Sequence, residues 1–331
     1  MFKRKHSFKP SKYIGRLEKY LEEYSSSEEV STETQEGVTK ELATIRAALY
    51  GEPDKEPDPD VVETVVSMLI DPESELLFNL FQYFTRFDVD TRSDFARIVS
   101  CVMRHKGTLD PVKYVLHRPE ILKILIDAYD LDSNSALTAG LILRDCLKSE
   151  RISKHVLDTY LEKLFEQTQV RSFDIGSDAF ATLKTLLTQH KRTLSTYLTA
   201  NYDDFFAKYR QLLLSENYVT RRQSVKLLAE MLLDQANFAL MKKYIADADN
   251  LKLMMKLLID PNKSIQFEAF HVFKVFVANP KKSESEGVMS ILTKNKDKMI
   301  AYLSDFQNDR DGQDDQFKDE KQLLIRELKR L

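Results

Sequence analysis

The sequence predicts an all-α protein built as an armadillo/HEAT-like helical-repeat solenoid, a right-handed superhelix with a concave binding face. The 331 residues include only eight glycines and nine prolines, and strong helix formers such as Leu, Lys, Glu and Ala fill the chain. Apolar residues recur at helical spacing over most of its length. Similar helices also recur about every 45 residues, which is a period typical of stacked helical repeats.

The internal repeat is clearest in three segments that align without gaps, residues 177–187, 222–233 and 267–277. The small residues Ala179, Ser224 and Ala269 occupy one repeat position, 45 residues apart. The neighbouring positions are apolar in all three copies, at Phe180, Val225 and Phe270, at Leu183, Leu228 and Phe273, and at Leu186, Met231 and Phe276. A fourth copy lies around residues 139–143, and a fainter one around 95–103. Small residues let neighbouring helices approach, and the larger ones fill a continuous core.

Taken in order, residues 1–10 are predicted to form a basic tail and residues 11–331 a single repeat domain. Gly51 is expected to end the second helix, and EPDKEPDPD (52–60), with three prolines, to be an extended connector. The predicted helices are Ser11–Tyr24, Thr34–Tyr50, Val61–Ile70, Pro72–Phe87, Ser93–His105, two that start at Pro111 and Pro119, Asn134–Lys148, Lys154–Gln169, Phe173–His190, Tyr202–Leu214, four within Asn217–Pro280, Val288–Gln307 and Gln316–Leu331.

Composition narrows the class of protein. The net charge of -3 argues against a general nucleic-acid binder, which needs a broad cationic field. Cys101 and Cys146 form neither a CxxC motif nor a disulfide framework, which favours a reducing compartment. No apolar run approaches the length of a membrane span. We therefore expect a cytoplasmic protein, monomeric by itself, that neither inserts into membranes nor binds nucleic acid.

The sequence contains no recognised catalytic or cofactor motif. A glycine-rich phosphate loop and the HExxH, GxSxG and protein-kinase signatures are all absent, and the six histidines are widely separated. His271 is interpreted as a structural histidine. Aligning Gly312 with the EF-hand template places Gln307 and Lys318 at the two essential carboxylate positions, so calcium binding there is not expected. We predict a protein without enzymatic activity, metal or cofactor.

A binding surface is therefore the predicted function of the repeats. Arg222 and Lys226 lie one helical turn apart and outside the predicted core stripe. Arg221 and Arg222 also fall near a helix start, where cations are disfavoured unless a partner's carboxylate meets them. The alternative is a solvated basic turn.

Apolar residues beyond the core stripe add further candidates. Met255 lies between Lys252 and Lys256, so an apolar site rimmed by cations would suit an aromatic and acidic peptide. Phe173, Tyr218 and Phe238 are comparable candidates for aromatic contacts. The alternative for each of these side chains is a place in the core.

Several segments resemble a known family. They are SENYVTRRQSVKLL (215–228), DNLKLMM (249–255), IQFEAFHVFKVFVANP (265–280), FQNDR with DEKQLLI (306–325), FDIGSDAFATLKTLLTQHK (173–191) and ALYG with KEP (48–57). The pattern is similar to the mouse protein twenty-five family, also called calcium-binding protein thirty-nine. The match is dense from Phe173 onward and thinner before it.

The resemblance implies a non-catalytic scaffold that binds and allosterically activates sterile-twenty or germinal-centre-class protein kinases, or a pseudokinase. The implied setting is signalling for cell polarity, morphogenesis and cell division, with recruitment to sites of polarised growth or division. By this resemblance, a pocket for a C-terminal Trp-Glu-Phe-type motif of the partner would include Phe173, Arg222, Met255 and Lys294. A concave surface facing the kinase would include Tyr218, Lys226 and Phe238.

Two departures from the family pattern bear on these contacts. Gln235 stands where the animal pattern has arginine, and segment 281–288 before the next helix is longer than usual. The alternative function is a general peptide-binding armadillo adaptor not dedicated to kinases. Such an adaptor would need a regular Trp/Asn ladder, whereas the chain has no tryptophan.

Overall fold

The computed structural model describes residues 8–51, 56–280, 282–310 and 314–331. All regular elements among these residues are helices. The chain divides into two compact units, residues 1–189 and 190–331, and each is described by itself. The prediction that residues 11–331 form one domain stays a prediction.

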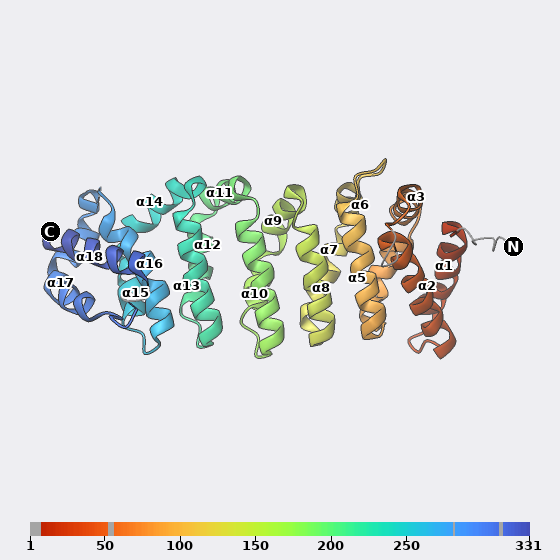
Figure 1. Cartoon of the computed structure of the whole chain (residues 1–331), viewed down its shortest axis with the longest axis horizontal. Coiled ribbons are helices and arrows are strands. Elements are labelled where there is room, and N and C mark those ends of the chain that lie inside the picture. Colours follow the sequence, from red (N-terminus) through yellow and green to blue (C-terminus); the bar gives the residue numbers. More distant parts are fainter. Residues whose placement is uncertain (1–7, 52–55, 281, 311–313) are drawn as a thin grey trace. The chain divides into compact units, whose positions relative to one another are not determined.

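Unit 1 is a stack of helices, and residues 52–55 of the extended connector predicted between its second and third helices lie outside the described part of the chain. Its α-helices are α1 (Pro10–Ser26), α2 (Thr32–Tyr50), α3 (Pro59–Leu69), α4 (Leu76–Tyr83), α5 (Val89–Arg104), α6 (Pro111–His117), α7 (Glu120–Asp127), α8 (Ser133–Cys146), α9 (Glu150–Gln167) and α10 (Phe173–Thr188). Two 3₁₀ turns, η1 (Phe84–Arg86) and η2 (Ala128–Asp130), extend α4 and α7. Within this unit α2 packs on α5, α5 on α8 and α8 on α10, so equivalent helices stand side by side (Figure 1).

A polar cluster joins α8 to α10 inside unit 1. The Arg144 guanidinium donates to both carboxylate oxygens of Asp178, each at 2.9 Å. Tyr129 Oη donates to Asp178 Oδ2 at 2.7 Å and lies 2.8 Å from Thr182 Oγ1. Gly140 is required beside this cluster because a Cβ there would lie 1.8 Å from the Asp178 carboxylate. Every charged group of the cluster thus has its partner within the unit.

Unit 2 repeats the same construction. Its α-helices are α11 (Lys191–Ala200), α12 (Tyr202–Leu213), α13 (Tyr218–Leu233), α14 (Phe238–Ala246), α15 (Ala248–Leu258), α16 (Lys263–Ala278), α17 (Glu286–Asp305) and α18 (Asp315–Lys329). Two 3₁₀ turns, η3 (Gln235–Asn237) and η4 (Lys282–Glu284), precede α14 and α17. The helix pairs α13 and α16, α15 and α16, and α17 and α18 form its main packing contacts.

The repeat positions found in the sequence are confirmed as core. Ala179, Ser224 and Ala269 are fully buried on α10, α13 and α16, and the apolar residues aligned beside them are buried as well. Burial of the Ser224 hydroxyl is compensated because Oγ donates to the Thr220 carbonyl at 2.7 Å. An all-helical repeat solenoid is therefore the fold of the chain.

Asparagine side chains cap the N-termini of α13 and α16, the two helices that form the candidate site described below. Asn217 Oδ1 accepts from the backbone N–H of Val219 at 2.9 Å and of Thr220 at 3.3 Å. Asn262 Oδ1 accepts from Ser264 N at 3.0 Å. Such caps satisfy N–H groups that have no partner within the helix, which fixes where each helix starts.

A buried lysine anchors the last helix of unit 2. The side chain of Lys321 on α18 is almost fully buried, and its Nζ donates to the Phe306 carbonyl at 3.0 Å and to Asn308 Oδ1 at 2.7 Å. Phe317 of the same helix packs against the rings of Phe267, Phe270 and Phe306 in tilted and edge-to-face arrangements. The position of α18 is thus set by both packing and a buried charge.

Most predicted helices are present, but none is predicted where α11 (Lys191–Ala200) lies, and α5 and α9 begin four residues before the predicted starts at Ser93 and Lys154. The helix predicted from Pro72 to Phe87 begins only at Leu76, because residues 71–75 form a turn closed by Asp71 and Ser74. The first helix begins one residue before its predicted start at Ser11. The helix begins at Pro10, and the capping position is Lys9. Residues 1–7 of the predicted basic tail lie outside the described part of the chain. Gly51 ends α2 with a positive φ of 78°, as predicted.

Candidate functional site

Basic and acidic side chains meet in a cleft between α13 and α16 of unit 2. We call this space the charged cleft. It has a volume of about 450 Å³ and is lined by Arg222, Lys226, Ala229, Glu230, Leu233, Ser264, Phe267, Glu268, His271 and Arg310. Two of the residues singled out in the sequence, Arg222 and Lys226, therefore lie in the same space, as their spacing of one helical turn predicts.

A buried carboxylate lies at the base of the charged cleft. Glu268 on α16 is almost fully buried, and its Oε1 lies 3.6 Å from Arg222 Nη2. Burial raises the pKa of the Glu268 carboxyl, and the positive charges of Lys226 and Arg222 offset that shift only in part. Arg222 remains half exposed, so its guanidinium has donors that still face solvent.

The two adjacent arginines at the start of α13 have different tasks. Arg221 donates to the Ser215 carbonyl at 3.1 Å, and its Nη2 lies 3.3 Å from Asp260 Oδ2. It therefore ties the turn before α13 to the turn before α16. Arg222 instead points into the charged cleft, where a partner could meet it.

The opposite wall of the charged cleft combines aromatic and cationic groups. The Arg310 guanidinium lies over the Phe267 ring at 4.2 Å, and the His271 ring meets Phe267 edge to face at 4.7 Å. Burial lowers the pKa of His271, so this imidazole is held neutral near pH 7. Arg222, Lys226 and Arg310 then outweigh the two acidic lining residues, Glu230 and Glu268, and the cleft favours an anionic partner group.

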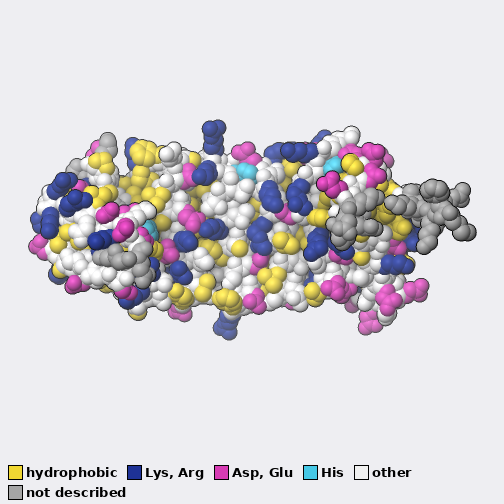
Figure 2. All heavy atoms as spheres, viewed as in Figure 1, with side chains coloured by type: hydrophobic (Ala, Val, Ile, Leu, Met, Phe, Trp, Pro, Cys, Tyr) yellow, Lys and Arg dark blue, Asp and Glu magenta, His cyan; other side chains and the backbone are white. Residues whose placement is uncertain are grey.

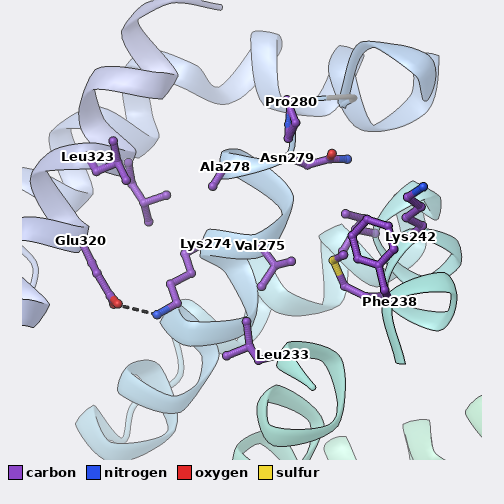
Figure 3. A pocket seen from close by; sticks show the side chains of 13 residues that line it. Leu233, Phe238, Lys242, Lys274, Val275, Ala278, Asn279, Pro280, Glu320 and Leu323 are labelled. Atoms are coloured by element: carbon purple, nitrogen blue, oxygen red, sulfur yellow. Dashed lines mark hydrogen bonds and ion pairs between the residues drawn. The ribbon is translucent and has the colours of Figure 1, made fainter. Parts of the chain in front are cut away.

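A second, apolar space lies in the same unit (Figure 3). We call it the apolar cavity. It has a volume of about 520 Å³ and is lined by Leu233, Phe238, Met241, Lys242, Ile245, Lys274, Val275, Ala278, Asn279, Pro280, Glu320, Leu323 and Leu324. Its walls come from α13, α14, α16 and α18, which are far apart in the sequence. Lys242 Nζ lies 4.5 Å from the centre of the Phe238 ring.

An ion pair closes one side of the apolar cavity. Lys274 Nζ donates to Glu320 Oε2 at 2.8 Å, as Figure 3 shows, and so links α16 to α18. Although burial opposes ionisation of Glu320, hydrogen bonds from Lys274 and Gln316 lower the pKa of its carboxyl. Leu233 lines both the charged cleft and the apolar cavity, so the two spaces adjoin at this side chain.

The remaining predicted site residues occupy four other places. Phe238 lies in the wall of the apolar cavity, and Tyr218 is the partly exposed first residue of α13. Met255 on α15 is partly exposed and Lys294 on α17 is exposed, and neither lines the charged cleft or the apolar cavity. Since α15 packs on α17, these two residues belong to neighbouring helices. Phe173, the first residue of α10 in unit 1, is 62% exposed.

Sequence reasoning missed three groups that complete the site. Glu268 is an acidic residue inside the apolar repeat segment 265–277, which was a signal that it could be a buried partner of Arg222. Arg310 lies in a polar loop 88 residues after Arg222, and no local pattern connects the two. The same is true of Leu323, which α18 brings to the wall of the apolar cavity.

The described residues contain no group of three or more His, Cys, Asp or Glu side chains placed to hold a metal ion. The calcium-loop alignment on Gly312 falls partly on residues 311–313, which lie outside the described part. In the same described ranges, no helix has both the length and the apolar character of a membrane span.

Comparison with known proteins identifies the family. The sequence profile of the Mo25-like family matches residues 1–331. The chain belongs to the Mo25-like family. It is 44% identical over 299 residues to the Mo25-like protein of Schizosaccharomyces pombe, covering 89% of each protein. It is 40% identical over 334 residues to the human calcium-binding protein 39-like, covering all of this chain and 97% of the relative.

A further similar protein occurs in an alga. The chain is also 44% identical over 297 residues to the degreening-related gene dee76 protein of the alga Auxenochlorella protothecoides, covering 88% of this chain and 90% of that protein. The similarity to these relatives extends through both units. The match to the Mo25-like family therefore confirms the resemblance found in the sequence segments of this chain.

Proposed function

We propose that this Mo25-like protein is a non-catalytic scaffold that binds a sterile-twenty or germinal-centre-class kinase, or a pseudokinase, in the cytoplasm. Unit 2 is the proposed docking region. By binding the active conformation of the kinase more tightly than the inactive one, the scaffold would shift the population toward activity without performing chemistry itself. The cell-polarity and division setting implied by the family resemblance belongs to the same proposal.

The charged cleft is the observation that carries this proposal. It offers a half-exposed arginine, an exposed lysine and a third cation above one buried carboxylate. Beside it the apolar cavity supplies a surface for a large hydrophobic side chain. A kinase surface that presents an acidic residue next to an apolar one would find partners for both, which is the combination typical of a specific docking interface.

Calorimetry with a purified sterile-twenty-class kinase domain tests the docking region. We expect Arg222→Ala and Lys226→Ala each to weaken binding about tenfold, because each removes one charge-assisted contact. Lys318→Ala, an exposed cation of α18 that lines neither space, serves as the matched control. Kinase activity measured with and without the scaffold should rise only where binding is retained. Full binding by both cleft variants would remove the charged cleft from the interface.

The proposed Trp-Glu-Phe peptide pocket needs a separate measurement. Arg222 lines the charged cleft, whereas Met255 and Lys294 lie on α15 and α17. We expect a labelled peptide that ends in Trp-Glu-Phe to lose affinity with Met255→Ala and with Lys294→Ala. An additional loss with Arg222→Ala would show that the peptide also reaches the charged cleft. No binding by the folded wild-type chain would contradict the pocket.

A general peptide adaptor is the competing function. The apolar cavity alone would accept hydrophobic side chains from many partners, since it is lined by adaptable groups such as Met241. An adaptor would bind kinase and unrelated peptides through this cavity without changing kinase turnover. A rise in kinase turnover that Arg222→Ala abolishes would favour the dedicated scaffold.

A further inference from the structure

A recurring feature of unit 1 lies outside the charged cleft and the apolar cavity, although the family resemblance also assigns one of its residues, Phe173, to the Trp-Glu-Phe pocket. One apolar side chain lies just before, or at the first residue of, each of the side-by-side helices α2, α5, α8 and α10. We call these segments the lead-in loops. Val30, which is partly exposed, and Leu131 precede α2 and α8, and Val89 and Phe173 are the first residues of α5 and α10. Val89, Leu131 and Phe173 follow one another at intervals of 42 residues and are 58%, 61% and 62% exposed.

Exposure of a large apolar residue near the start of the successive helices α5, α8 and α10 is not explained by packing. A single exposed apolar side chain is ordinary, whereas a row of them marks an interaction surface. Within unit 1 the helices behind the row pack consecutively, α2 on α5, α5 on α8 and α8 on α10. The four side chains therefore form a line along one rim of the unit.

Polar contacts hold neighbouring lead-in loops together. Arg86 donates to the Ser27 and Glu28 carbonyls at 2.8 and 2.9 Å, which joins the first two loops. Arg92 of α5 donates to Ser135 Oγ of α8 at 2.7 Å, and the buried Gln167 of α9 donates to the Ile126 carbonyl of α7 at 2.8 Å. Because these contacts fix the helices beside the loops, the row is ordered before any partner arrives.

Acidic residues flank the apolar ones. The sequence reads Glu-Glu-Val at 28–30, Asp-Val-Asp at 88–90, Asp-Leu-Asp at 130–132 and Phe-Asp at 173–174. The cations of the same loops are Arg86, which is bound to backbone carbonyls, and Arg171. Lys163 and Arg92 offset Asp130 and Asp132 in part, at 2.7 and 4.0 Å. An excess of negative charge remains, and Figure 2 shows acidic side chains gathered where α1 and α2 join.

The spacing of the row specifies the shape of a partner segment. Packed helices lie about 8–10 Å apart. A polyproline II segment rises about 3.1 Å per residue with three residues per turn, so every third side chain points the same way about 9 Å further on. A β-strand would turn every third side chain to the opposite face. The polyproline II form thus matches one apolar residue to each lead-in loop.

We propose that the rim of unit 1 formed by the lead-in loops is a second docking surface, which binds an extended partner segment with an apolar residue at every third position and basic residues between. The basic side chains meet the carboxylates, and the apolar ones meet Val30, Val89, Leu131 and Phe173. This interaction is separate from kinase docking in unit 2, so one partner chain could engage both or two partners could bind at once.

Fluorescence anisotropy with two synthetic peptides tests the rim. The first has the sequence Leu-Pro-Arg-Leu-Pro-Lys-Leu-Pro-Arg-Leu, and the second has the same composition with its four leucines placed together at one end. We expect the full chain to bind the first peptide about tenfold more tightly than the second. Leu131→Asp should weaken the first peptide about tenfold, because it sets a charge against an apolar contact. Equal affinity for both peptides would overturn the proposal.

Charge variants and a matched control complete the test. Asp90→Lys combined with Asp174→Lys should weaken binding about tenfold and reduce its dependence on salt, since neither residue is a helix cap. Ile259→Asp alters an apolar residue of unit 2 that is 66% exposed and lines neither the charged cleft nor the apolar cavity, and it should leave affinity for the first peptide unchanged. Arg222→Ala should also leave it unchanged, which separates this result from the proposed kinase docking. Unchanged binding by Leu131→Asp or by the charge variant would overturn the rim site.

Discussion

Two arginine–carboxylate pairs connect equivalent repeat helices, and they differ in how completely they are satisfied. In unit 1, Arg144 of α8 holds both oxygens of Asp178 of α10 at 2.9 Å, and Tyr129 donates to the same carboxylate. In unit 2, Arg222 of α13 approaches Glu268 of α16 only to 3.6 Å and stays half exposed. The first pair is saturated and structural, whereas the second keeps donors that a partner can use.

Removing the fully hydrogen-bonded carboxylate of Asp178 should have the largest effect on stability. We expect Asp178→Ala to lower the free energy of unfolding by about 2–3 kcal/mol, since it leaves the Arg144 guanidinium and the Tyr129 hydroxyl without their partner in a largely buried site. Urea denaturation measures the change. A loss below about 0.5 kcal/mol, which is the range of surface ion pairs, would remove the contrast with unit 2.

The stability contributed by the buried Glu268 carboxylate should respond to pH in the opposite way from that of an ordinary ion pair. Burial raises the folded-state pKa of Glu268 above its usual 4.5, so ionising this carboxyl costs folding free energy. Glu268→Gln should therefore become more stable relative to the wild type as the pH rises from about 4 to 7. Denaturation midpoints at several pH values test this, and a relative stability that falls over the same range would contradict it.

Glu63 in unit 1 gives the reverse pH dependence. Its Oε1 accepts from Thr108 N at 3.1 Å and its Oε2 lies 2.6 Å from His105 Nε2, and these contacts lower its pKa to about 2. The contribution of the ionised Glu63 to stability is fully present above the pKa of the unfolded state, and it is lost as the pH falls through the lower pKa of the folded state. We expect the difference in the free energy of unfolding between the wild type and Glu63→Gln to shrink as the pH is lowered from 5 to 2. A difference that does not change with pH would show that these contacts fail to favour the ionised form.

The smallest stability effect is expected for Arg222→Ala. A half-exposed arginine 3.6 Å from its carboxylate contributes little to folding, so the free energy of unfolding should change by less than about 0.5 kcal/mol. Thermal denaturation followed by circular dichroism measures it. A loss as large as that of Asp178→Ala would show that Arg222 is a structural residue.

The repeat core could be predicted from the sequence because its signal is local and periodic. Ala179, Ser224 and Ala269 recur every 45 residues, and all three are buried where neighbouring helices approach. Arg222 and Lys226 could likewise be placed together, since residues four apart share a helix face. These inferences need no knowledge of how distant helices pack.

Other parts of the site depend on contacts between distant segments. Arg310 reaches the charged cleft from a loop after α17, and Leu323 forms a wall of the apolar cavity only because α18 docks on α16. Lys321, which anchors that helix, has the sequence character of a surface residue and is nevertheless buried. Side-chain periodicity cannot indicate such contacts, because it reports which face of a helix is apolar and not what that face meets.

Leu233 is shared by the charged cleft and the apolar cavity, and this sharing has a thermodynamic consequence. A group that fills one space and rotates Leu233 alters the volume left in the other. Two ligands, or two segments of one partner, would then have linked affinities, each raising or lowering the other by the same factor. A single leucine at the end of α13 would thus couple binding in one space to binding in the other.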